Sequence, residues 1–186
     1  MLGTYSRLTK QEALDLYRTQ VVQDFDENEI KPEETIRRLL DDGIYFCEGI
    51  TDEKGKVLAY AYLLETEGIL FLDYFAVLQA FRGKHYGTEL LKTVIRKTKM
   101  PILFEVEDPK MANSQEEAEK MEKRIRFYVF VGARRSDVQV SAFGHPYILM
   151  TVNQDEKDRK TLTDQYRMIY RTILKERMER YICIND

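Results

Sequence analysis

The feature that most constrains the fold is a set of three β-rich runs joined by very short polar turns. The runs cover residues 44–50, 57–64 and 69–77, and the turns at 52–55 and 65–68 are rich in Asp, Glu and Gly. Turns this short connect strands that lie side by side and run antiparallel. The first half of the chain therefore predicts an antiparallel three-stranded meander.

A helix and a further extended run follow the meander directly. Apolar residues recur at helical spacing from Gly87 to Thr98, and Pro101 ends this pattern before the extended run at 102–106. A strand reached through a helix of this length generally lies parallel to the strand before it. The sheet is therefore predicted to be mixed and mostly antiparallel, with one parallel pair of strands.

Amphipathic helices are predicted on both sides of this segment in the sequence. Two of them begin with a capping box, Thr9 with Glu12 and Ser114 with Glu117. The predicted helices cover residues 9–26, 32–42, 114–131 and 158–181, and a late strand pair covers 138–140 and 147–152. This order of elements is typical of an α+β fold in which helices form layers on a mixed central sheet.

Length and composition favour one domain. The chain has 186 residues, of which 44% are hydrophobic and 33% are charged, as in ordinary globular proteins. No repeat and no Pro/Gly/Ser-rich linker marks a boundary. We therefore predict a single domain over residues 1–186, with a core at about 9–152 and a C-terminal helical extension at about 158–181.

Charge and cysteine usage argue against several classes of partner. The formal net charge of −3 offers no attraction for nucleic acid or for anionic membrane surfaces. No secretion signal or spanning apolar run is present, and Cys47 and Cys183 lack the C-x-x-C spacing. With two histidines in the chain, a metal site has few ligands to draw on. We expect a cytoplasmic protein without metal, nucleic acid or membrane partners.

The segment with the most chemical information is residues 73–88, where an apolar strand runs into a basic loop and then directly into a helix. Backbone N–H groups at a helix N-terminus favour a phosphate, because they are unpaired and lie at the positive end of the helix dipole. Arg82 and Lys84 add positive charge, and Gly83 permits a close approach. This pattern predicts a phosphate-binding loop, with an ordinary strand-to-helix turn as the alternative.

Two other phosphate-binding patterns do not fit this loop. A Walker A loop requires Ser or Thr after the Gly-Lys pair, where this chain has His85, and a first glycine where it has Leu78. A Rossmann fingerprint requires a βαβ unit, whereas the strand here is preceded by an antiparallel meander. Nucleotide hydrolysis and dinucleotide binding are therefore not expected.

The loop resembles the acyl-coenzyme A motif Q/R-x-x-G-x-G/A of the GNAT (general control non-repressible-type) N-acetyltransferase superfamily. Arg82 stands at its first position, His85 at the middle glycine and Gly87 at the last. The resemblance implies the GNAT fold, with splayed strands over 69–77 and 102–107, and acetyl-coenzyme A as co-substrate. It implies coenzyme A contacts by a strand edge that pairs with the pantetheine amides and by the loop, namely Phe75, Ala76, Val77, Arg82, Gly83, Lys84, His85, Tyr86, Gly87 and Thr88.

Residues 126–133 resemble the family's helix that ends in F-Y-x-x-x-G-F, with Ala133 in place of the last aromatic. The resemblance puts Tyr128 on the family's tyrosine and implies that it protonates the departing coenzyme A thiolate. A phenol with a pKa of about 10 is protonated at neutral pH, as a general acid must be. The alternative is a core aromatic residue on an amphipathic helix.

Three carboxylates interrupt or end apolar strands and are candidates for taking the proton of the acceptor amine: Asp73, Glu105 and Glu107. Strand alternation places Glu105 and Glu107 together on the face of Leu103. The alternative for each is a solvated strand-end charge, paired for example with Arg124 or Arg126.

These patterns predict an enzyme that transfers an acyl group directly from acyl-coenzyme A to a primary amine of a small molecule, a peptide or a protein. Direct transfer is favoured because Ser, Cys and His form no nucleophile-and-base pattern. The alternative is a coenzyme A-binding sensor or assembly module without turnover. The apolar stripe of the tail helix either packs on its own domain or forms a homodimer.

Overall fold

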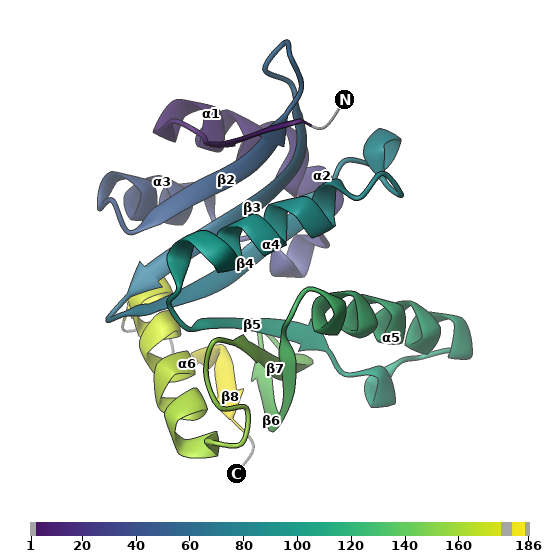
Figure 1. The fold of residues 1–186 in the computed structure, drawn as a ribbon. Coiled ribbons are helices and arrows are strands. Elements are labelled where there is room, and N and C mark those ends of the chain that lie inside the picture. Colours follow the sequence, from purple (N-terminus) through teal and green to yellow (C-terminus); the bar gives the residue numbers. More distant parts are fainter. Residues whose placement is uncertain (1–2, 176–179, 185–186) are drawn as a thin grey trace. The chain divides into compact units, whose positions relative to one another are not determined.

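A computed structural model describes residues 3–175 and 180–184 of the chain (Figure 1). The strands follow the order β1-β2-β3-β4-β5-β7-β6-β8 in one sheet. The chain divides into two compact units, unit 1 with Met1–Glu65 and Leu72–Thr98, and unit 2 with Thr66–Phe71 and Lys99–Asp186. The prediction of a single domain stays a prediction.

Most of the predicted meander belongs to unit 1. Strands β2 (Tyr45–Thr51), β3 (Val57–Thr66) and β4 (Ile69–Val77) cover the three predicted runs, and β2 and β3 pair antiparallel. A short strand, β1 (Thr4–Arg7), pairs antiparallel with β2. No sequence pattern predicted β1, because its four residues are all exposed or half-buried and show no apolar alternation.

The predicted N-terminal helix is divided in the structure by a π-helical turn. Thr9 and Glu12 form the predicted capping box, in which each side chain accepts a hydrogen bond from the other residue's backbone N–H. The second helix was predicted to begin at Pro32. In the structure it begins at Glu33, and Pro32 is its N-cap residue. The helical elements of unit 1 are α1 (Lys10–Leu16), η1 (Tyr17–Val21), α2 (Val22–Asp24), η2 (Glu27–Glu29), α3 (Glu33–Asp41), η3 (Gln79–Phe81) and α4 (Tyr86–Thr98).

Helices lie on both faces of the strands in unit 1. The Tyr62 hydroxyl on β3 donates to the Ala13 carbonyl of α1 at 2.5 Å. The Lys97 ammonium of α4 lies 4.1 Å from the centroid of the Tyr5 ring on β1. The strand register places Tyr62 and Tyr5 on opposite faces, so α1 and α4 are on opposite sides of these strands.

Unit 2 holds the second half of the sheet. The parallel pair is confirmed, because Leu70 and Phe71 of β4 pair in parallel with Ile102 and Leu103 of β5. The late hairpin is confirmed with longer strands than predicted. The elements of unit 2 are β5 (Ile102–Glu107), η4 (Pro109–Met111), α5 (Gln115–Phe130), β6 (Arg134–Ala142), β7 (His145–Val152), α6 (Arg159–Leu174) and β8 (Ile182–Ile184).

The strands of unit 2 are also covered on both faces. The ring of Phe104 on β5 lies 4.7 Å from the ring of Tyr128 on α5. The next residue, Glu105, accepts a hydrogen bond from Tyr170 on α6 at 3.0 Å. Successive strand residues point to opposite faces, so α5 and α6 lie on opposite sides of β5. The predicted helix–sheet–helix layering is therefore present in each unit.

The C-terminal helix is shorter than predicted. Helix α6 ends at Leu174, and Lys175 has a φ of 54°, which is incompatible with continuing an α-helix. The predicted end at Tyr181 is therefore wrong. Residues 182–184 form β8, which pairs antiparallel with β6, whereas residues 176–179 of the predicted helix lie outside the described part of the chain.

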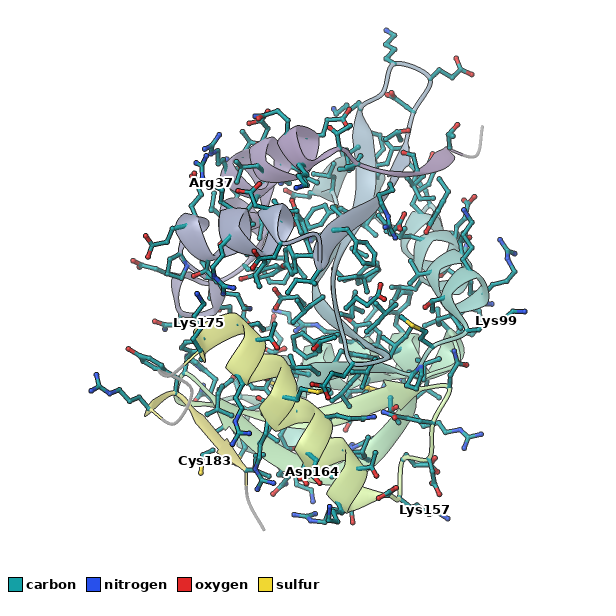
Figure 2. The ribbon with its side chains drawn as sticks, turned by 90° about the vertical axis from the view of Figure 1, so that its left-hand side faces the viewer. Arg37, Lys99, Lys157, Asp164, Lys175 and Cys183 are labelled. Atoms are coloured by element: carbon teal, nitrogen blue, oxygen red, sulfur yellow. The ribbon has the colours of Figure 1, made fainter. Side chains whose placement is uncertain are left out.

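The apolar stripe of α6 is buried within unit 2, as the first of its two predicted alternatives requires. Its outer face is charged, and Asp164 on that face pairs with Lys160 at 2.7 Å and with Arg167 at 3.3 Å (Figure 2). Because the stripe is used for internal packing, it supplies no argument for a homodimer. None of the described helices is long and apolar enough to cross a membrane.

Candidate functional site

The loop between β4 and α4 passes through two left-handed residues. Gly83 has a φ of 76° and His85 a φ of 66°. Glycine takes this conformation without steric cost, and histidine takes it more often than most residues with a side chain. His85 is exposed, so its side chain has room. A histidine at the place of a glycine is therefore compatible with the turn that leads into α4.

The N-terminus of α4 follows this turn. The first helical hydrogen bond runs from the Glu89 N–H to the His85 carbonyl at 3.0 Å. The backbone N–H groups before Glu89 have no carbonyl one turn earlier within the helix, and they lie at the positive end of its dipole. Gly87 is buried, and Thr88 is half-buried in the same turn. This arrangement fits a phosphate group.

The charged side chains of the loop are exposed and anchored at its base. The Arg82 Nε donates to the Val77 carbonyl at 3.1 Å, which holds the guanidinium at the end of β4. The Lys84 ammonium lies 5.4 Å from the centroid of the Phe81 ring. The predicted strand-edge residues Phe75, Ala76 and Val77 are half-buried. Unit 1 thus holds together all ten residues predicted to contact coenzyme A.

Asp73 lies in a buried ion pair that no sequence pattern predicted. Its Oδ1 is 2.6 Å from the Lys31 Nζ, and its Oδ2 accepts a hydrogen bond from the Tyr45 hydroxyl at 2.5 Å. The side chains of Lys31 and Asp73 are 6% and 3% exposed. Both oxygens of Asp73 are therefore engaged, and accepting a substrate proton requires this cluster to open.

Tyrosines also fix the backbone of Lys31. Its N–H donates to the Tyr74 hydroxyl at 3.1 Å, and its carbonyl accepts a hydrogen bond from Tyr17. Burial, and then the charge of Asp73, raise the pKa of Tyr45 and of Tyr74 well above the ordinary tyrosine value. These phenols stay protonated and available as donors, so the cluster is a fixed structural unit at neutral pH.

Glu105 connects β5 to the C-terminal helix. It accepts hydrogen bonds from Tyr166 and from Tyr170, the latter at 3.0 and 3.1 Å to its two oxygens. Burial, and then the charge of Glu105, raise the pKa of Tyr166 well above its ordinary value. Both tyrosines are buried on α6, and no local sequence pattern indicates that their hydroxyls contact a carboxylate.

Tyr128 lies beside an ion pair at the end of β5. Its side chain is buried, with 8% of the residue surface exposed. Arg124, one turn earlier on α5, pairs with Glu107. Burial raises the pKa of Tyr128 to about 12, the charge of Arg124 lowers it, and that of Glu107 raises it. The phenol is therefore protonated at neutral pH.

Glu105 and Glu107 are held by different helices, although alternation predicted that they share a face. Glu107 is the last residue of β5, and its side chain pairs with Arg124 on α5. The ion pair with Arg124 that the alternative expected is present at Glu107. In unit 2 the structure brings Glu107 close to Tyr128, while Glu105 serves the contact with α6. Among the described residues, no group of three or more His, Cys, Asp and Glu side chains is arranged to hold a metal ion.

Comparison with known protein families shows the family to which the chain belongs. The model of the Acetyltransferase (GNAT) family matches residues 11–121, which is more than half of the chain. The chain belongs to the GNAT acetyltransferase family. The matched range of this GNAT protein includes the loop at 82–88 and ends before Tyr128. No curated protein matches the chain in sequence.

Solved structures share the fold of this GNAT protein at low sequence identity. A protein of Bacteroides thetaiotaomicron assigned to the GNAT family is 20% identical, with a TM-score of 0.73 over 92% of this chain and 97% of its own. The ribosomal-protein-S18-alanine N-acetyltransferase of Escherichia coli is 17% identical, with a TM-score of 0.60 over 81% and 92%. An aminoglycoside 6′-N-acetyltransferase in complex with coenzyme A is 15% identical, with a TM-score of 0.57 over 80% and 95%.

Proposed function

We propose that this GNAT protein transfers an acetyl or related acyl group from acyl-coenzyme A to a primary amine. The observation that carries the proposal is the loop of Arg82, Gly83 and His85, whose left-handed residues lead into the N-terminus of α4 within the range matched by the family. A solved structure of the same fold is a complex with coenzyme A. The residues present fit a pyrophosphate, because exposed cations and helix N-terminal amides meet in one turn.

In this proposal the loop binds the pyrophosphate of the co-substrate, and the co-substrate supplies the activated thioester. Arg82 contributes charge to the pyrophosphate, and the amides of the first turn of α4 contribute directed hydrogen bonds. The strand edge at Phe75, Ala76 and Val77 is assigned to the pantetheine amides. Binding through these groups orients the thioester without contacting the reacting carbon.

The chemical step needs a proton acceptor for the ammonium and a proton donor for the thiolate. We assign the donor role to Tyr128, because its raised pKa keeps the phenol protonated. We assign the acceptor role to Glu107, acting directly or through water. Its side chain is 34% exposed, whereas Asp73 and Glu105 each have both oxygens engaged by other side chains.

The acceptor is proposed to be a primary amine of a small molecule or of a protein. Structures with this fold carry names of both kinds, an aminoglycoside acetyltransferase and a ribosomal-protein-alanine acetyltransferase. A second candidate function is coenzyme A binding without turnover. It is supported by the engagement of Asp73, Glu105 and Glu107 in hydrogen bonds or ion pairs.

The binding half of the proposal is tested by calorimetric titration of coenzyme A into the wild type and into Arg82→Ala. We expect micromolar binding by the wild type and about tenfold weaker binding by Arg82→Ala, because one charge-assisted phosphate contact is lost. Arg96→Ala is the matched control, since Arg96 is exposed in the last turn of the same helix. Equal affinities of all three proteins, or no binding by folded wild type, would contradict the assignment of the loop.

A further inference from the structure

Two lysine side chains from separate parts of unit 1 lie over the ring of Phe81. The Lys56 ammonium lies 5.3 Å from the ring centroid and the Lys84 ammonium 5.4 Å from it. Tyr86 makes an edge contact with the same ring at 6.3 Å. Both ammonium groups are within the distance at which a ring attracts a cation. Lys56 therefore belongs spatially to the loop at 82–88, although it follows a turn far away in the sequence.

The turn between β2 and β3 fixes the backbone at Lys56. The Asp52 Oδ1 accepts hydrogen bonds from the N–H groups of Lys54 and Lys56, each at 2.9 Å. The Asp52 N–H donates to the Lys56 carbonyl at 2.9 Å. The turn is thus closed by one aspartate. Lys54 lies in the same turn, and within the described residues its ammonium makes no ring contact or ion pair.

The cations around Phe81 are not neutralised by the protein itself. Over the described ranges 3–175 and 180–184, Lys56, Arg82 and Lys84 form no ion pair with a carboxylate. Arg18, in contrast, pairs with Glu33 at 2.6 Å. Glu89, in the first turn of α4, is the acidic residue nearest in sequence to Lys84, and its Oε2 is buried. The site carries more positive charge than one pyrophosphate requires.

We propose that Lys56 and Lys84 bind a second phosphate group of the same co-substrate, the phosphomonoester on the ribose of coenzyme A. This inference rests on the proposed function. The pyrophosphate is assigned to Arg82 and the amides of α4, which leaves two ammonium groups for the phosphomonoester. A phosphomonoester carries about −1.5 to −2 charges at neutral pH and so matches two ammonium groups. Lys56 thereby makes the protein selective for coenzyme A over dephospho-coenzyme A.

The test is a calorimetric titration of coenzyme A and of dephospho-coenzyme A into the wild type, Lys56→Ala and Lys54→Ala. For Lys56→Ala we expect about tenfold weaker binding of coenzyme A and unchanged binding of dephospho-coenzyme A. Lys54→Ala should behave as the wild type, because it removes a charge from the same turn without touching Phe81. Thermal melts check folding, and Lys56 is exposed, so no loss of stability is expected.

The outcomes separate this inference from the proposed function. Wild type that binds coenzyme A, with Lys56→Ala weakening both ligands equally, would overturn the role of Lys56 and leave the proposed function standing. The same holds if Lys54→Ala and Lys56→Ala weaken coenzyme A to the same extent, since that result reports only general charge. Wild type that binds neither ligand would remove the proposed function and this inference together.

Discussion

Tyr128→Phe is expected to lower kcat for acyl transfer by about 10²-fold or more, with little change in KM. The substitution removes the phenolic proton and keeps the ring that packs on Phe104 at 4.7 Å. The pKa of Tyr128 is raised to about 12, so the acid form persists throughout the neutral and moderately alkaline range. The contribution of Tyr128 should therefore be constant with pH below that value and fall only above it.

Tyr5→Phe serves as the control for removing a tyrosine hydroxyl, because Tyr5 lies on β1 in unit 1 and contacts Lys97. It should leave kcat unchanged. Steady-state kinetics with thiol detection of released coenzyme A measures both variants. Equal rates for Tyr128→Phe and wild type at saturating substrates would show that the thiolate obtains its proton elsewhere, and Tyr128 would then be a core aromatic residue only.

Lys31→Met is expected to destabilise the protein by about 3–5 kcal/mol, because it leaves the charge of Asp73 buried without a partner. Asp73 is 3% exposed and lies 2.6 Å from the Lys31 ammonium. Methionine keeps most of the side-chain volume, so the loss reports charge more than packing. Urea unfolding followed by circular dichroism gives the free energy of unfolding for each variant.

Two comparisons make this prediction specific. Arg18→Met breaks an exposed ion pair with Glu33, with side chains 38% and 41% exposed, and should cost less than about 1 kcal/mol. Adding Asp73→Asn to Lys31→Met removes the unpaired charge and should restore most of the lost stability. If Lys31→Met costs no more than Arg18→Met, the buried pair is not an important structural contact, and Asp73 regains its place as a candidate base.

The sequence predicted those parts of the fold that depend on local patterns. The meander follows from three apolar runs and two short turns, and the parallel pair follows from the helix that connects β4 to β5. The capping box at Thr9 is a short-range signal, and it is present. In each case a few neighbouring residues determine the backbone.

The features of the structure that the sequence did not predict depend on contacts between distant residues. Strands β1 and β8 have four and three residues, and pairing with β2 and β6 defines them more than any pattern of their own. Lys31 and Asp73 are 42 positions apart, and Tyr166 and Glu105 are 61 apart. Nothing near any of these residues in the sequence indicates its partner, because the tertiary fold alone brings them together.

The candidate site likewise contains a loop that local sequence predicted and carboxylates whose contacts it did not predict. The loop at Arg82, Gly83 and His85 was predicted from a continuous segment, and in the structure Gly83 and His85 have positive φ values just before α4. The roles of the carboxylates were not predictable, because each depends on a partner from another element. Lys31 holds Asp73, the tyrosines of α6 hold Glu105, and Arg124 holds Glu107.

The most direct test of the central claim is an acyl-transfer assay with wild-type protein, acetyl-coenzyme A and a panel of primary amines that includes polyamines, aminoglycosides, amino acids and peptides. Released thiol and the mass of the acceptor are measured together. The account predicts that at least one amine gains an acetyl group in step with coenzyme A release, and that Tyr128→Phe slows both. Intact coenzyme A binding without acetylation of any amine would contradict it and favour the binding module.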